Sequence, residues 1–315
     1  MAPDQSQPIT IDHVAFIVNP SSGGGGGGRI YLAVAEELRR HGVRIAAFET
    51  LRDGGAAPAV EAALRAGFTE IWVIGGDGTI QEAIGPIIEA DAVLGPIPGG
   101  TGNRLVEVVG CDCYDPVAQA RWMMRQPVKR MDVGLVNGRY FTVRVGIGFE
   151  AVVASKTEDD KSGLGNFAYV LASLRAARHI DTYDVRVTSG DELVYDGPMV
   201  AGMFANVPVR VVLRVPALEA ANPVDGGLHV IMARERPGIE ALWRWVTGIG
   251  DEPPKDEVLD HFAPEYTMEI EGGAMVHIDG EAVGMLDTLR VECLSGGLRI
   301  RGLDLTTPAK PRGAL

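Results

Sequence analysis

The sequence has few cysteines and no long apolar run, and each absence excludes a class of protein. Its 315 residues include only three cysteines, Cys111, Cys113 and Cys293. An odd count without framework spacing disfavours a secreted disulfide scaffold. No second Cys or His pair completes a zinc site with Cys111 and Cys113, so we interpret them as ordinary thiols. No stretch approaches the roughly 18 consecutive apolar residues of a membrane-spanning helix.

Positive charge is also scarce. Lys and Arg number 29 against 42 Asp and Glu, which gives a formal net charge of −13. Proteins that bind nucleic acid usually carry a basic surface, so we expect no nucleic-acid partner. Residues 1–12 show neither the basic start nor the apolar run of a signal peptide. Together with the cysteine content, this predicts a cytoplasmic protein.

The first part of the chain alternates between strands and helices. Apolar residues make up 46% of the sequence, which is enough for a sizeable core. Continuously apolar strands that alternate with helices are typical of a parallel sheet with helices on both faces. We predict strands at residues 14–18, 43–49, 71–74 and 92–97, and helices at residues 30–41, 57–66 and 79–89.

After about Met131 the pattern becomes mainly β. Four segments alternate between apolar and polar residues and contain tight glycine turns, which indicates antiparallel hairpins. Only residues 166–179 and 238–248 resemble helices in this part. We therefore predict an α/β domain followed by a mainly antiparallel β domain.

Three glycine-rich turns follow strands of the predicted parallel sheet. They occupy residues 19–28, 75–79 and 98–103. Ligands of such sheets bind beyond the carboxyl ends of the strands, and the N–H groups that open the next helix favour an anion. Glycine lets a ligand approach the backbone closely, although it also occurs in turns for steric reasons alone. If several of these turns converge, a polyphosphate would suit them.

Two familiar nucleotide motifs are excluded by single residues. The run Gly23–Gly28 continues into Arg29 without the Lys and Ser/Thr of a P-loop. The second turn does not continue as a dinucleotide fingerprint, because Gln81 occupies the last glycine position. Asp77 leaves two interpretations open. It either serves a cation that bridges to phosphates, for which Mg²⁺ is suited, or caps a helix that starts near Thr79.

The motifs VNP, GGDGT, PGGTGN and a late DGE occur in that order, together with NPVDGGLHV at residues 222–230. In this order they resemble the diacylglycerol kinase catalytic family, which includes bacterial lipid kinases and sphingosine kinases, over roughly residues 14–303. The resemblance implies an α/β ATP-binding domain at residues 11–132, to which residues 297–306 return. It also implies a β-sandwich lipid-substrate domain at residues 133–296, with ATP and lipid meeting between the two.

Site residues follow from the matching motifs. The resemblance implies Glu281 as the general base for the lipid hydroxyl, and Asp77 as the carboxylate that serves Mg²⁺-ATP. Asp279 would hold the turn or assist the metal. Expected nucleotide-binding residues are Asn19, Thr50, Gly75, Gly76, Asp77, Gly78, Thr79, Ile80, Gln81, Gly100, Thr101 and Asn103, and expected Mg²⁺ ligands are Asn222, Asp225 and Gly227. Taken alone, DGE could equally be a type I′ hairpin turn, and residues 225–227 a simple Asp-Gly-Gly turn.

The implied function is an ATP- and Mg²⁺-dependent lipid kinase that phosphorylates a hydroxyl of a lipid such as diacylglycerol or a sphingoid base. Alternatives are a GGDG-type kinase with a soluble acceptor, similar to NAD kinase, and a catalytically silent nucleotide- or lipid-binding module. The chain departs from the family pattern at Val143, at Arg104 and at residues 207–218. These departures leave the identity of the acceptor open.

A lipid kinase without a spanning helix must act peripherally at a membrane surface. Trp243 and Trp245 could anchor it there, or could pack in a core. A homodimer is one assembly that we consider, since the sequence does not fix the oligomeric state. The densest basic cluster could face phospholipid or form a solvated helix face, and it comprises Arg121, Arg125, Lys129 and Arg130.

Overall fold

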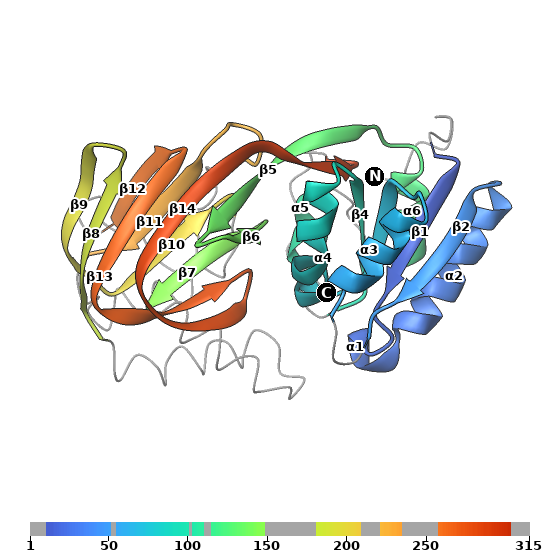
Figure 1. Ribbon diagram of the computed structural model, residues 1–315, viewed down its shortest axis with the longest axis horizontal. Helices are drawn as coiled ribbons and strands as arrows, with labels where there is room; N and C mark the ends of the chain where they lie inside the picture. Colours follow the sequence, from blue (N-terminus) through green and yellow to red (C-terminus); the bar gives the residue numbers. More distant parts are fainter. Residues whose placement is uncertain are drawn as a thin grey trace, which may run out of the picture. The chain divides into compact units, whose positions relative to one another are not determined.

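The structure is a computed structural model, and it describes residues 11–51, 55–100, 103–109, 115–148, 181–208, 221–234 and 258–303. The chain forms two compact units, unit 1 (Met1–Met131 with Gly296–Leu315) and unit 2 (Asp132–Ser295). Two strands, β5 (Val128–Val136) and β14 (Glu281–Arg301), contribute residues to both units (Figure 1). Within these ranges, no helix has the length and apolarity needed to cross a membrane.

Unit 1 is built on a parallel sheet. Its strands are β1 (His13–Val18), β2 (Arg44–Glu49), β3 (Glu70–Gly75) and β4 (Val93–Pro98), in the order β2-β1-β3-β4. The end of β14 adds a fifth parallel strand beside β4, with Arg299 opposite Val93. Because the order reverses direction at β1 and β3, their carboxyl ends form a topological switch point, which is where open α/β sheets bind ligands.

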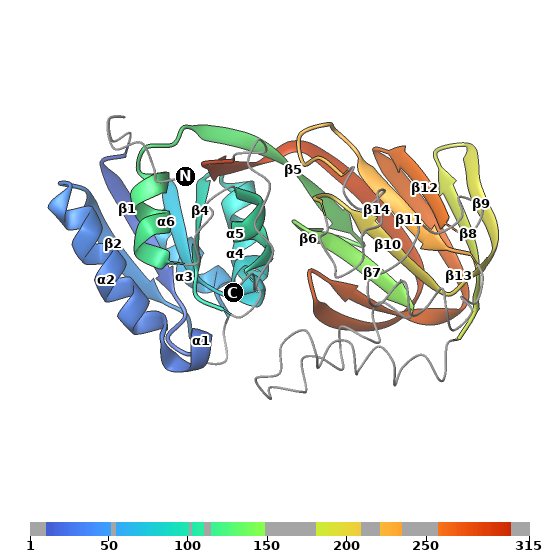
Figure 2. The ribbon, with the colours of Figure 1, turned by 180° about the vertical axis from the view of Figure 1, so that it is seen from behind.

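Helices cover both faces of this sheet. The helices are α1 (Ser22–Gly25), α2 (Gly27–Arg40), α3 (Ala57–Arg65), α4 (Asp77–Glu89), α5 (Arg104–Val109) and α6 (Pro116–Met123). Leu38 of α2 and Met123 of α6 pack against Phe16 and Trp72 on one face (Figure 2). Helices α3 and α4 contact β1 to β4 from the other face. The glycine run covers α1 and the start of α2, but Gly23, Gly24 and Gly25 have positive φ, so this part is a turn rather than a regular helix.

A buried ion pair fixes the returning end of β14 in unit 1. The Arg301 guanidinium donates to both carboxylate oxygens of Glu70, with Nη2 at 2.9 Å from Oε2. Trp72 Nε1 donates to the same carboxylate at 3.0 Å, and Arg301 Nη1 donates to the carbonyl oxygen of Gln126 at 2.7 Å. Since buried charges need such partners, the chain end is an integral part of this unit.

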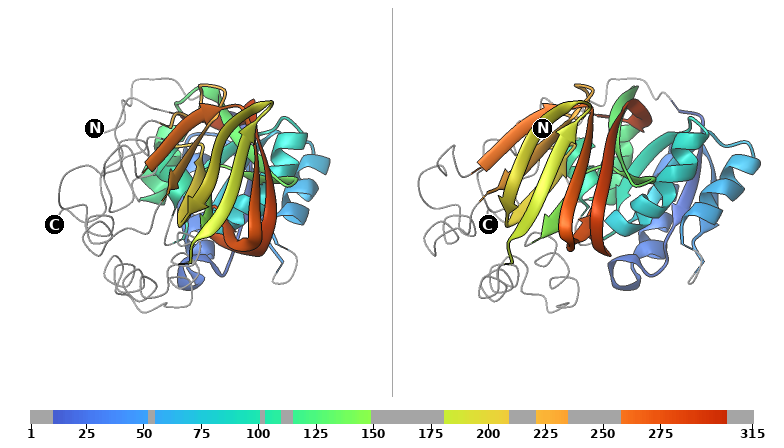
Figure 3. Two further views of the ribbon diagram at one scale, coloured as in Figure 1. Left: turned by 90° about the vertical axis from the view of Figure 1, so that its left-hand side faces the viewer. Right: turned by 60° about the vertical axis from the view of Figure 1, so that its left-hand side comes forward.

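Unit 2 is mainly antiparallel. Its further strands are β6 (Arg139–Phe141), β7 (Arg144–Gly148), β8 (Tyr183–Ser189), β9 (Glu192–Met199), β10 (Ala201–Ala205), β11 (Leu228–Ala233), β12 (Val258–Ala263) and β13 (Glu265–Ile278). The order is β12-β11-β10-β7-β13-β14, and the β8–β9 hairpin pairs with β13 (Figure 3). Alternate residues such as Phe204, Val230 and Met268 face a common core.

The predicted fold class is confirmed: a parallel α/β region precedes a mainly antiparallel β region. Glycines interrupt two of the long strands. Gly272 and Gly273 lie inside β13 at a break in register, and Gly296 lies inside β14. All three have positive φ, so they act as irregularities within long strands. The helices predicted at residues 166–179 and 238–248 lie outside the described residues.

Candidate functional site

The three glycine turns meet at the carboxyl edge of the parallel sheet. Asn19 N donates to the carbonyl oxygen of Ile74 at 3.1 Å, which joins the first turn to the end of β3. Gly99 N donates to Gly75 O at 3.0 Å, which joins the third turn to the second. Thr50 follows β2, and its N–H donates to Val18 O at 2.9 Å. Four strand ends therefore lie together.

Several of these glycines lie where the turns are packed too closely for a side chain. A Cβ on Gly75 would lie 2.5 Å from the Cβ of Thr79, and a Cβ on Gly100 would lie 2.5 Å from the Cα of Gly76. Gly23 has a φ of 59°, and a Cβ there would meet Gly99 O at 2.7 Å. These distances leave no room for a side chain, so the steric interpretation of glycine holds at these positions.

Gly78 is different. It lies in the first turn of α4 with no positive φ, it is exposed, and a Cβ there would meet no atom within 4 Å. Neither backbone conformation nor packing therefore requires glycine at this position. It adjoins the first N–H groups of α4, which have no acceptor within the helix itself. A ligand that approaches these N–H groups would meet no side chain at this position.

Asp77 is the first residue of α4, and Gly76 occupies the N-cap position without a side-chain capping bond. Asp77 therefore lies inside the first turn of the helix rather than at its N-cap position. Its Oδ1 instead accepts a hydrogen bond of 2.6 Å from the backbone N of Arg104, the first residue of α5. The carboxylate thus joins the second and third turns and remains half-buried.

The polar side chains of the turns largely bind the turns themselves. Asn19 Nδ2 donates to the hydroxyl oxygen of the buried Thr79 at 3.0 Å. Asn103, which has a φ of 55°, exchanges hydrogen bonds of 2.9 and 2.7 Å with the backbone of Gly100. Ile80 is buried in the core and Gln81 is half-buried, while Thr101 lies outside the described residues. Sequence reasoning missed Ser22, whose hydroxyl donates to Asn19 O at 3.0 Å.

Glu281 lies in unit 2, directly after a two-residue turn. Asp279 and Gly280 have φ of 50° and 98°, which matches the positive values of a type I′ hairpin turn between β13 and β14. The DGE motif is therefore a hairpin turn, as its alternative interpretation stated, and it presents Glu281 at the first position of β14. The Glu281 side chain is half exposed, and its Oε2 lies 3.8 Å from Arg139 Nη2.

The Asp279 carboxylate is bound by the neighbouring turn between β6 and β7. It accepts hydrogen bonds from Thr142 N at 2.7 Å, Val143 N at 2.9 Å and Arg144 N at 2.8 Å. Burial raises the pKa of Asp279, and these hydrogen bonds act against that rise. Val143, a position of departure from the family pattern, contributes its N–H here and buries its side chain. Asp279 therefore holds the turn.

The Asn222–Gly227 turn brings two carboxylates together. Asp132 is buried, and its Oδ2 accepts from Gly226 N at 2.7 Å, one residue after Asp225. Partial desolvation raises the pKa of Asp225, and the charge of Asp132 adds to the rise. Sequence reasoning missed Asp132. Its only signal was its position between the apolar residues Met131 and Val133 of β5. Gly227 packs against Phe262, where a Cβ would lie 2.4 Å from Cζ.

This turn fits a hard cation in part. Asp225 and Asp132 supply oxygen donors whose mutual repulsion a divalent ion would relieve. The carbonyl of Asn222 already accepts from Val224 N at 2.8 Å and Asp225 N at 3.3 Å, so it is a poor candidate ligand. In the described part of the chain, no three His, Cys, Asp or Glu side chains converge to hold a metal. Water and backbone oxygens would have to complete the shell.

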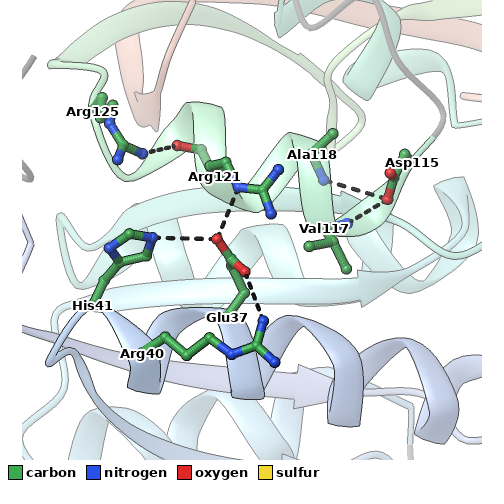
Figure 4. A network of polar contacts seen from close by, with 8 residues as sticks. All are labelled: Glu37, Arg40, His41, Asp115, Val117, Ala118, Arg121 and Arg125. Atoms are coloured by element: carbon green, nitrogen blue, oxygen red, sulfur yellow. Dashed lines mark hydrogen bonds and ion pairs between the residues drawn. The ribbon is translucent and has the colours of Figure 1, made fainter. Parts of the chain in front are cut away.

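The basic cluster proposed to face phospholipid is engaged within unit 1. Arg121 Nε donates to Glu37 Oε1 at 2.8 Å, and this bond, together with the charge of Arg121, holds the pKa of Glu37 below its usual range (Figure 4). Arg125 donates to Arg121 O at 2.9 Å, and Lys129 donates to Leu303 O at 2.7 Å. These bonds join elements of unit 1, while Lys129 and Arg130 remain exposed. Trp243 and Trp245 lie outside the described residues.

Comparisons with known proteins agree with this architecture. Residues 13–136 match the diacylglycerol kinase catalytic domain. A diacylglycerol kinase of Staphylococcus haemolyticus is 30% identical over 278 residues, which cover 86% of this chain and 82% of that protein. A diacylglycerol kinase of Bacillus subtilis is 26% identical over 279 residues, with coverages of 86% and 90%.

Solved structures share the fold. One crystal structure from Bacillus anthracis str. Sterne superposes with a TM-score of 0.77 at 20% identity and covers 96% of this chain and 99% of its own. A crystal structure of a diacylglycerol kinase from the same organism gives 0.70 at 20% identity, with coverages of 95% and 100%. With the sequence matches, these findings place the chain: it belongs to the diacylglycerol kinase catalytic domain family.

Proposed function

We propose that the protein is an ATP-dependent lipid kinase that transfers the γ-phosphoryl group to a hydroxyl of a lipid such as diacylglycerol or a sphingoid base. The observation that carries this proposal is the meeting of three glycine turns at the carboxyl edge of the parallel sheet, in a chain of this family. Unit 1 binds the nucleotide and unit 2 the lipid. The protein reaches its substrate peripherally at a membrane surface, since no helix in the described ranges could span the membrane.

The phosphates of ATP bind where α4 begins. The first N–H groups of this helix point out of its amino end, and the helix dipole favours an anion there. Gly78 leaves the approach open, while the packed glycines on either side keep the turns rigid. Thr50 lies at the neighbouring strand end and completes the nucleotide environment.

Glu281 acts as the general base. Its carboxylate accepts the proton of the lipid hydroxyl while the hydroxyl oxygen attacks the γ-phosphorus and ADP leaves. A positioned base of this kind contributes typically ~10²- to 10⁴-fold to the rate. The side chain is half exposed on a fixed turn, so a substrate hydroxyl can reach it.

Mg²⁺ has two roles in the proposal. When bound, it neutralises charge on the phosphates during transfer, with Asp77 as the carboxylate that serves it. Asp77 is the first residue of α4, beside the N–H groups where the proposal puts the phosphates. The second role is structural: Asp225, assisted by Asp132, holds an ion in the Asn222–Gly227 turn.

An acceptor screen tests the proposal. Purified protein with Mg²⁺ and radiolabelled ATP is given diacylglycerol, sphingosine, phosphatidylglycerol or NAD side by side, the lipids in mixed micelles. Labelled lipid product is expected, and labelled NADP would instead favour the soluble-acceptor kinase. ATP binding without transfer to any acceptor would favour the silent module.

The variant Glu281→Gln tests the assignment of the base. We expect it to bind ATP normally and to lose ~10²- to 10⁴-fold in kcat, because Gln cannot take up the proton. If turnover stays intact, Glu281 is not the base. Arg139→Gln is a useful companion, since it removes the partner of Glu281 but leaves the carboxylate in place.

A further inference from the structure

The turn that carries Glu281 is held much more firmly than a hairpin requires. Three successive backbone N–H groups, of Thr142, Val143 and Arg144, converge on the carboxylate of Asp279 at 2.7 to 2.9 Å. The Thr142 hydroxyl adds a fourth bond at 3.0 Å. Successive N–H groups of this kind form a concave anion-binding site. Here a carboxylate of the same unit fills it.

The backbone of the turn is fixed as well. Asp279 N donates to Arg144 O at 2.9 Å, and Gly280 N donates to Nδ1 of the buried His277 at 3.1 Å. In the sheet register, Ile278 lies opposite Val145 of β7 and opposite Glu281 of β14. Ile278 and Asp279 are therefore tied to β7, Gly280 is tied to His277 of β13, and Glu281 is the next residue.

The segment that binds Asp279 is itself anchored in the interior. Asn206 is buried, and its Nδ2 donates to Thr142 O at 2.9 Å and to Asp132 O at 2.8 Å. Asn206 N also donates to Val143 O at 3.0 Å. The anchor thus extends from a buried amide through Thr142 to the Asp279 carboxylate.

We propose that Asp279 and Thr142 are positioning residues, which fix the turn so that the Glu281 carboxylate points at the acceptor hydroxyl. The inference rests on the proposed function, because it assumes that Glu281 is the base. A base must lie within hydrogen-bond reach of the proton that it removes, and a displacement of ~1 Å can cost ~10²-fold in rate. An exposed Glu on an unsupported hairpin would not hold such a position.

The chain offers a matched control in the turn between β5 and β6. Asn137 and Gly138 have φ of 47° and 81°, so this turn has the same pair of positive angles. Asn137 also holds a neighbouring strand, since its Nδ2 donates to Thr288 O at 2.9 Å and its Oδ1 accepts from Arg290 N at 2.8 Å. This turn carries no proposed base. Asn137→Gly therefore removes a similar support, and Arg139→Gln measures any effect that reaches Glu281 through Arg139, which follows this turn.

The test compares Thr142→Val, Thr142→Ser and Asp279→Gly with Asn137→Gly. Glycine keeps the positive φ of residues 279 and 137, so both glycine variants remove only the side-chain bonds. We expect Thr142→Val to lower kcat ~5- to 10-fold, Thr142→Ser to restore it, and Asp279→Gly to lower it ~10²-fold. The dissociation constant of ATP should stay within about twofold in all variants, and Asn137→Gly should leave kcat unchanged.

A double-mutant cycle with Glu281→Gln separates positioning from general structural damage. If Thr142 and Asp279 act through the Glu281 carboxylate, their changes cost nothing further once that carboxylate is gone. If the losses multiply with that of Glu281→Gln, or if Asn137→Gly lowers kcat equally, the inference is overturned. Should Asp279→Gly not fold, the isosteric Thr142→Val alone decides. If Glu281→Gln keeps full activity, the proposed base and the inference both fall, whereas multiplying losses overturn the inference only.

Discussion

Gly78 offers a direct test of how the nucleotide is bound. It is the second residue of α4, it has no positive φ, and nothing lies within 4 Å of a Cβ placed there. In the free protein, Gly78→Ala should therefore be harmless. Replacing glycine by alanine inside a helix stabilises it by roughly 0.5–1 kcal/mol, and we expect a gain in the free energy of unfolding up to that size.

With ATP the same methyl group should be harmful. It would stand beside the N–H groups that open α4, where the proposal puts the phosphates. Losing one hydrogen bond to a charged group costs about 1.5–3 kcal/mol, which corresponds to at least ~10-fold in the dissociation constant. The variant should thus be more stable than the wild type without nucleotide and bind ATP more weakly.

Gly28→Ala is the matched control. Gly28 is likewise the second residue of its helix, α2, with no positive φ and no atom within 4 Å of a Cβ. Calorimetric titration of ATP with Mg²⁺, together with thermal unfolding, measures both quantities for the two variants. We expect similar gains in stability but weaker ATP binding only for Gly78→Ala. ATP binding by Gly78→Ala within twofold of the wild type would refute the assignment of this turn to the phosphates.

Three further predictions concern the supports of the site. Gly100→Ala would press a methyl against Gly76, so we expect urea unfolding of unit 1 to show a loss of about 1–3 kcal/mol, and an unchanged midpoint would contradict the packing of the turns. Glu70→Gln leaves Arg301 buried without its ion pair, and urea unfolding should show a loss of about 3–5 kcal/mol, larger than for the exposed Glu61→Gln. The pKa of Asp225 is raised in the folded protein, so its ionisation opposes folding as the pH rises through that pKa. In EDTA at neutral pH, Asp225→Asn should therefore be slightly more stable than the wild type in thermal melts. The gain should be under about 1 kcal/mol, because the side chain is largely exposed. Mg²⁺ should raise the melting temperature of the wild type but not of Asp225→Asn, and equal responses would exclude a site at this turn.

The sequence was sufficient for β1 to β4 and for α2, α3 and α4, since their apolar residues follow the strand and helix periods closely, whereas α1, α5 and α6 were not predicted. The strand β3, for example, is predicted at residues 71–74 and observed at Glu70–Gly75. The position of the glycine turns could also be predicted, because each follows a buried strand. The contacts that require glycine could not be predicted, because they depend on the order of the strands in the sheet. Gly76 touches Gly100 only because β3 and β4 are neighbours.

Hydrogen bonds between residues distant in the sequence were the main feature that could not be predicted. The Asp77 carboxylate receives the N–H of Arg104, 27 residues away, and no local pattern indicates such a bond. Asp132 accepts a hydrogen bond from Gly226 N, 94 residues away, and no motif around Asp132 in β5 predicts this bond. Asn206 likewise has no recognisable motif, although its amide joins two segments. Such contacts depend on register and topology, which composition and spacing do not encode.

The return of β14 to the sheet of unit 1 has a consequence for synthesis on the ribosome. While the nascent chain is shorter than about 300 residues, β4 lacks the partner that Arg299 and Ile300 supply, and Glu70 lacks its arginine. An open strand edge and an uncompensated buried carboxylate then remain through most of translation. Unit 1, whose first strand begins at residue 13, can therefore complete its sheet only when nearly the whole chain has been made. A stop codon only a few residues before Arg301 would destabilise this sheet.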